Sequence, residues 1–164
     1  MVLLVKTSEV VKYTTLSGLL DTDKFLQYIA IAQDIHIENY LGSALLEKLQ
    51  NDIQNSTLSG NYLTLVNKYI TPMLIHWAMV EYLPFAPYQI ANKGVFKHST
   101  ENGDTIDSFG LNKLIDKEKD SAQLYTQRFI DYINANSGLF PEYNTYVNGR
   151  VQKDTDQDYF GWVL

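Results

Sequence analysis

His76 and Glu81 are the side chains best placed to do acid–base chemistry. Apart from tyrosines, they are the ionisable residues of the apolar stretch from Tyr69 to Ala91. A buried histidine or glutamate can act as a general base when its surroundings shift its pKa. Their spacing puts them on different faces of a straight helix, so each should meet its own partner. No nucleophile accompanies them, and we interpret both as hydrogen-bonded polar residues of a core or an interface.

Two other groups have the residue types of a metal site but lack its spacing. His36 lies two positions from Asp34 and from Glu38, whereas two zinc ligands on one helical face lie a full turn apart. The run DTDQD at residues 154–158 resembles the first half of a calcium loop, but Tyr159 stands where that loop needs glycine. We therefore expect a surface histidine and a solvated acidic segment, with no metal and no cofactor.

Composition and motifs exclude several classes of function. The sequence has no cysteine, which excludes disulfides, thiolate nucleophiles and cysteine-based zinc sites. It contains no nucleophile elbow, phosphate-binding loop or dinucleotide-binding fingerprint. We predict that the protein is not an enzyme. The enzymatic alternative is a small helical enzyme that uses Glu81 or His76 as a buried base.

The charge distribution does not favour nucleic-acid binding. The chain has 19 acidic and 13 basic residues, a formal net charge of −6. Its lysines are not clustered as duplex DNA binding requires; those at 113, 117 and 119 alternate with acidic residues, as on a solvated helix face. No apolar run approaches the roughly 20 residues of a membrane helix, and the first ten residues are too polar for a signal peptide. We expect neither specific DNA binding nor a membrane partner.

Apolar spacing predicts an all-α fold, a bundle of four to five helices. The expected helices span residues 7–13, 22–41, 43–54, 62–83 and 107–136, with interruptions at Gly42 and at Gly60. Pro72 should either kink the fourth helix or start a new one with Thr71 as its cap. The long polar loop at residues 92–107 would suit a β-hairpin or a flexible arm.

Residues 1–140 are expected to form one helical domain, and residues 141–164 an extended C-terminal tail. The tail has no periodicity and finishes in YFGWVL. A free aromatic end would be an unprotected apolar patch, so it should either pack back on its own domain or insert in a neighbouring subunit. The chain also has 12 tyrosines. Tyrosine is enriched at interface centres, which favours assembly over catalysis.

Three stretches resemble the head–tail connector (adaptor) proteins of tailed bacteriophages, in the version carried by phages of Bacteroidetes hosts, including the crAss-like group. They are LLDTDKFLQYIAIAQDIHIENYLGSALLEKLQ, then NKYITPMLIHWAMVEYLPFAPYQIANKGVFKHSTENG, and AQLYTQRFIDYINAN followed by FPEY. The resemblance covers roughly residues 5–143. It rests on the pattern of helices, prolines and glycines rather than on a catalytic signature.

This resemblance implies a structural role in the virion, after synthesis in the host cytoplasm. Connectors of this kind are helical subunits of a ring, typically dodecameric, that docks beneath the portal protein. The ring extends the DNA channel and presents a platform for the next neck or tail protein. The implied partners are therefore further copies of the chain, the portal protein and that next protein, while DNA passes without sequence-specific contact. The family carries no catalytic or cofactor residues to transfer.

Loops and tails of connectors commonly mediate ring and portal contacts, which points to Asn92–Asp107 and Pro141–Leu164 here. The predicted partner-interface residues in these segments are Asn92, Lys93, Val95, Phe96, His98, Tyr143, Tyr146, Tyr159, Phe160, Trp162 and Leu164. A second alternative stays open beside the small enzyme. It is a monomeric helical regulatory module that binds one protein partner through the apolar stretch.

Overall fold

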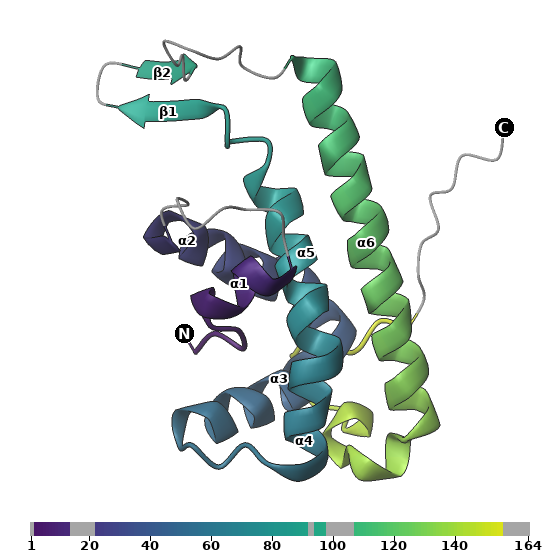
Figure 1. The fold of residues 1–164 in the computed structure, drawn as a ribbon. Helices are drawn as coiled ribbons and strands as arrows, with labels where there is room; N and C mark the ends of the chain where they lie inside the picture. The colour runs from purple at the N-terminus through teal and green to yellow at the C-terminus, as the bar shows by residue number, and fades with distance from the viewer. Residues whose placement is uncertain (1, 14–21, 92–93, 98–106, 156–164) are drawn as a thin grey trace, which may run out of the picture.

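A computed structural model describes residues 2–13, 22–91, 94–97 and 107–155, which are mostly helical (Figure 1). The elements are α1 (Thr7–Tyr13), α2 (Thr22–Ala32), α3 (Glu38–Gln54), α4 (Gly60–Leu65), α5 (Thr71–Tyr82), β1 (Tyr88–Ala91), β2 (Gly94–Lys97) and α6 (Ser108–Ala135). Two π-helical turns, η1 (Gln33–Ile37) and η2 (Val66–Ile70), precede α3 and α5, and two 3-10 turns, η3 (Ser137–Leu139) and η4 (Pro141–Asn144), follow α6. The predicted all-α class is confirmed for these residues, with one small hairpin added.

Helix α5 forms the centre of the core. Every residue from Thr71 to Val80 is buried, as expected for a helix that is apolar nearly all round. It packs against α6 on one side and α2 on the other, and α5 and α6 lie antiparallel in Figure 1. No helix in the described part of the chain is long and apolar enough to cross a membrane. The apolar stretch therefore serves as the core on which the other helices pack.

The helical segment from Gly60 to Tyr82 passes through Pro72 with the help of η2. A proline ring clashes with the carbonyl four residues earlier and offers no N–H. Here the Thr71 N–H bonds the Val66 carbonyl oxygen, five residues back, and this wider turn lies immediately before the proline. Ile70 precedes α5 with helical backbone angles and no side-chain cap. Of the two alternatives expected at Pro72, the new helix capped by Thr71 is therefore wrong.

Gly42 interrupts α3 as the sequence predicts. Its backbone angles are φ 73° and ψ 153°, a conformation open to glycine and costly for other residues. The C-terminal segment passes close to this point: the Ser43 N–H bonds the Val151 carbonyl oxygen at 3.0 Å. A Cβ atom on Gly42 would lie 3.2 Å from the backbone nitrogen of Lys153. Gly42 therefore bends α3 and leaves room for residues 151–153 to pass close to its backbone.

Residues 141–154 pack on the helical domain. The turn η4 contacts α3, and the Asp154 N–H bonds the Asn39 carbonyl oxygen at 2.6 Å. The tail is joined to the domain as far as this bond. Residues 156–164, including the aromatic end, lie outside the described residues.

Replacing Gly42 by alanine should lower the free energy of unfolding by about 1–3 kcal/mol, because the new Cβ meets both backbone strain and the Lys153 nitrogen. Urea-induced unfolding followed by circular dichroism measures this. Gly138→Ala is the matched control, since nothing lies within 4 Å of its Cβ position, and it should change stability by less than about 0.5 kcal/mol. Equal stability of the two variants would contradict the assigned role of Gly42.

Candidate functional site

Two histidine–glutamate pairs flank Trp77 on α5. His36 Nε2 lies 2.8 Å from Glu81 Oε1, and the His36 ring stacks on Trp77 with centroids 4.1 Å apart. His76 Nδ1 lies 2.6 Å from Glu118 Oε2, which connects α5 to α6. The first pair connects α5 to η1. Both pairs are partly buried, so each holds two helices in a fixed register.

These pairs show which contacts are made by the polar residues that the sequence singles out. His76 and Glu81 do meet different partners, as their spacing predicts, and both are hydrogen-bonded. The expectation of a surface histidine at 36 is wrong, because that ring is half-buried against Trp77. The Trp77 Nε1–H donates to Thr126 Oγ1 at 3.1 Å. The polar groups of this cluster therefore bind one another, and the arrangement cross-links helices.

No group of three or more histidine, cysteine, aspartate or glutamate side chains could hold a metal ion in the parts of the chain that the structure describes. Of the acidic run at residues 154–158, the structure describes Asp154 and Thr155 only.

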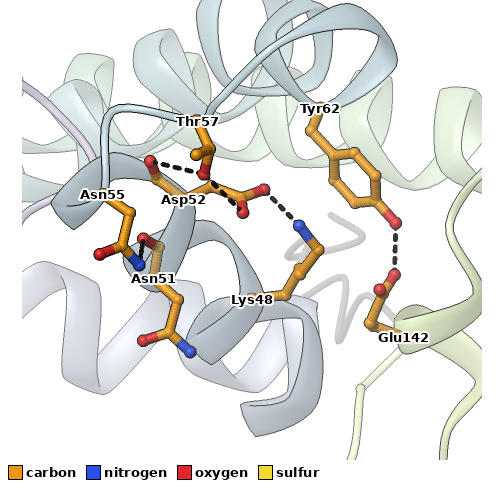
Figure 2. A network of polar contacts seen from close by, with 7 residues as sticks. All are labelled: Lys48, Asn51, Asp52, Asn55, Thr57, Tyr62 and Glu142. Atoms are coloured by element: carbon orange, nitrogen blue, oxygen red, sulfur yellow. Dashed lines mark hydrogen bonds and ion pairs between the residues drawn. The ribbon is translucent and has the colours of Figure 1, made fainter.

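A second polar network fastens the end of α3 to α4 and η4 (Figure 2). Lys48 pairs with Asp52 one turn later, and the Asp52 carboxylate accepts a hydrogen bond from Thr57 Oγ1 at 3.3 Å. The Tyr62 hydroxyl donates to Glu142, and the Lys48 ammonium lies 4.8 Å from the Tyr62 ring centroid. Burial and the bond to Glu142 raise the pKa of the Tyr62 hydroxyl. The network keeps the turn η4 against the bundle.

The N-terminal half of α6 contributes no buried side chain, although Glu118 within it bonds His76 of α5. Ala122 is the first buried residue of this helix, so residues 108–121 have only exposed or half-buried side chains and span about 20 Å of helix. Phe109 is 67% exposed and Leu114 is 48% exposed. The Lys113 ammonium lies 4.4 Å above the Phe109 ring. Apolar side chains on this stretch therefore face solvent in the monomer.

The hairpin lies at the same end of the molecule (Figure 1). Strands β1 and β2 pair antiparallel, with Tyr88 opposite Lys97 and Ala91 opposite Gly94. Within the described chain this sheet has two strands, so both are edges that can accept further main-chain hydrogen bonds. We call the hairpin 88–97 together with residues 108–121 the projecting end.

The predicted interface residues fall in three places. Val95 and Phe96 lie in β2, within the projecting end. Tyr146 is 74% exposed on the packed tail, whereas Tyr143 is 3% exposed and belongs to the core of the monomer, because η4 turns it towards Phe129. The remaining predicted residues, Asn92, Lys93, His98, Tyr159, Phe160, Trp162 and Leu164, lie outside the described residues.

Sequence reasoning missed the exposed apolar residues of the projecting end. Leu114 fits the apolar stripe of α6 and is expected to be buried, yet its side chain is 48% exposed. The surrounding charges could have indicated this exposure, because residues 113–120 carry charged side chains on every face of the helix. A helix with charges on every face has no broad apolar side to bury.

A family model described as "Family of unknown function (DUF6712)" matches residues 37–152 of the chain. The matched region runs from the end of η1 to the packed tail, and it includes both the projecting end and the network of Figure 2. No curated protein matches the chain, and no solved structure matches it.

Replacing Tyr143 by phenylalanine should stabilise the protein. The Tyr143 hydroxyl is buried and has no hydrogen-bond partner among the described residues, and such a group costs about 1–3 kcal/mol. We expect the free energy of unfolding to rise by about 1 kcal/mol at neutral pH. Tyr146→Phe, at an exposed position, is the control and should leave stability unchanged.

The same variant should alter the response to alkaline pH. Burial raises the pKa of Tyr143 from 10.0 to about 12, so between these values the unfolded chain releases this proton before the folded chain does. Below pH 10 this proton has no effect on the pH dependence of stability, and between pH 10 and 12 the free energy of unfolding of the natural chain falls. The advantage of Tyr143→Phe over the natural chain should therefore grow across this interval in urea unfolding. An advantage that stays constant with pH would contradict the assigned pKa.

Proposed function

Because the chain belongs to the family of unknown function DUF6712, kinship assigns no activity, and we propose from its geometry and its resemblance that it is a structural head–tail connector of a tailed phage. In this proposal copies of the chain form a ring, dodecameric in the family it resembles, under the portal protein. The ring extends the DNA channel and joins the capsid to the tail. Its other partner is the next neck or tail protein, and its place is the virion.

The projecting end is the observation that carries this proposal. Phe109 and Leu114 are exposed on this end, where a neighbouring subunit could cover them. A ring subunit presents two different surfaces to its two neighbours. A helix and a hairpin that extend beyond the bundle offer such surfaces, and the free strand edges add main-chain hydrogen bonding.

Charge and packing also support a connector. A channel through which DNA slides should not bind phosphate, and a net charge of −6 suits that requirement. The polar groups of α5 that resemble catalytic residues are engaged in cross-links between helices. In the proposed subunit a bundle of four to five helices forms the body, and the hairpin forms an arm.

Adding charge to the projecting end should prevent ring assembly. The test co-expresses the chain with the portal protein encoded in the same genome and counts rings on portals by electron microscopy. We expect complete rings for the natural chain and few for the double variant Phe109→Glu, Leu114→Glu, because buried carboxylates without partners are costly. Asn112→Glu, an exposed polar position between them, is the matched control and should assemble.

Complete portal-bound rings of the double variant would contradict the role of the projecting end. A genome without a portal gene, or a natural chain that stays monomeric and never binds the portal, would overturn the connector proposal. A monomer that binds one other protein would instead favour the regulatory module.

Removing residues 156–164 should weaken assembly on the portal while circular dichroism and urea unfolding remain unchanged. A chain that ends at Thr155 keeps both backbone bonds between the tail and α3, from Ser43 and from Asp154. A chain that ends at Glu142 is the contrasting control: it loses the buried Tyr143 side chain and should lose about 3–5 kcal/mol of stability. Full assembly of the Thr155-terminated chain would show that the aromatic end is dispensable.

A further inference from the structure

A groove with two basic rims lies between η2 and α6. It encloses about 580 Å³ and is lined by Lys68, Tyr69, Arg128, Asp131, Tyr132, Ala135 and Asn136. Tyr69 and Tyr132 stack with ring centroids 4.0 Å apart and ring planes 13° apart. The lining thus combines aromatic surface with cations, the residue types that are enriched where binding energy concentrates in protein interfaces. We call it the tyrosine groove.

The cations of the tyrosine groove are available for a partner. Lys68 and Arg128 are exposed and form no ion pair among the residues that the structure describes. The Arg128 guanidinium lies 5.7 Å from the Tyr125 ring, a contact that leaves its charge uncompensated. Asp131 is the one acidic residue in the lining, and its carboxylate accepts a hydrogen bond from Gln127 Nε2 at 2.7 Å. The rims therefore favour an acidic ligand.

We propose that the tyrosine groove binds the terminal segment of a second copy of the chain, residues 156–164 with the sequence DQDYFGWVL. This segment contains two aspartates, three aromatic residues and no basic residue. Its carboxylates would pair with the cations on the rims, and its aromatic side chains would pack on the stacked tyrosines. Charge and apolar character are thus complementary on the two sides.

The position at which the tail leaves the domain allows this exchange. The tail is held on α3 by the bond between Asp154 and Asn39, and the nine residues from 156 to 164 reach up to about 30 Å when extended. Each copy would offer one segment and receive another in its groove. Such a contact joins two different surfaces and can close into a ring. The inference therefore rests on the proposed ring and adds the contact that joins neighbours.

An acidic peptide suits the groove better than nucleic acid does. Duplex DNA binding gains its affinity from many phosphate contacts, whereas this groove offers Lys68 and Arg128 beside an acidic residue. The net charge of −6 would also repel a polyanion. The segment 156–164 has two aspartates, which is one for each of the two cations of the groove.

Disulfide trapping tests the contact, because the natural chain has no cysteine to interfere. One full-length preparation carries Ala135→Cys, in the groove lining, and a second, longer by an affinity tag, carries Phe160→Cys. Mixing them under mild oxidation should give a disulfide-linked heterodimer on non-reducing gels. Gln54→Cys replaces Ala135→Cys in the control, since it is an exposed position of α3 outside both the groove and the projecting end, and should give about tenfold less heterodimer.

Charge reversal provides the second measurement. Lys68→Glu with Arg128→Glu in the Ala135→Cys chain should reduce the heterodimer about tenfold, because both ion pairs become repulsive. Because Lys68 and Arg128 are exposed, these substitutions should not unfold the chain and so reduce the heterodimer yield indirectly. Circular dichroism of the variant checks this. An unchanged yield would overturn the inference.

Four further results would overturn it in distinguishable ways. Equal cross-linking at residues 54 and 135 would show a non-specific contact. A chain carrying both cysteines that closes a disulfide within itself at high dilution would make its own segment the occupant. Suppression of cross-linking by a short DNA duplex would make the groove a phosphate site. Rings on the portal without cross-linking would remove this inference alone, whereas cross-linking without portal-bound rings would remove the connector proposal and leave the exchange in place.

Discussion

The burial of α5 on all sides is the constraint on which the rest of the fold depends. A helix with no polar face must be enclosed, and α2 and α6 supply the enclosure. Apolar packing alone would permit these helices to slide. The two histidine–glutamate pairs and the bond from Trp77 to Thr126 remove that freedom, because a buried polar group must meet its partner. The residues that most resemble catalytic groups therefore specify the register of the bundle.

The projecting end follows from a difference in length. Helix α5 has 12 residues and α6 has 28, so α5 can cover only part of α6. The remaining part carries exposed apolar side chains together with charges on every face. Chain connectivity then places the hairpin at this end, since it joins the end of α5 to the start of α6. The core face and the proposed assembly surface are thus two parts of one helix.

Features that depend on local chemistry could be predicted from the sequence, and features that depend on neighbours could not. The bend at Gly42 and the start of α6 after Asp107, whose carboxylate accepts the Gly110 N–H at 2.7 Å, are local. The exposure of Leu114 depends on where α5 ends, and the burial of His36 depends on a glutamate 45 positions away. The tyrosine groove likewise joins Lys68 to Arg128, so no short stretch of sequence contains it. Helical periodicity shows that a residue can be buried, but only the neighbouring element decides whether it is.

The π-helical turns have a consequence for how this fold can vary. A π turn contains one residue more than an α turn, and that residue rotates all following side chains by about 100° around the helix axis. Because η2 lies between α4 and α5, the directions in which α4 points its side chains do not follow from those of α5 by regular α-helical spacing. Gain or loss of one residue within η2 would rotate the face that α4 presents while α5 stays enclosed. Such a change would re-aim α4 without rebuilding the core around α5.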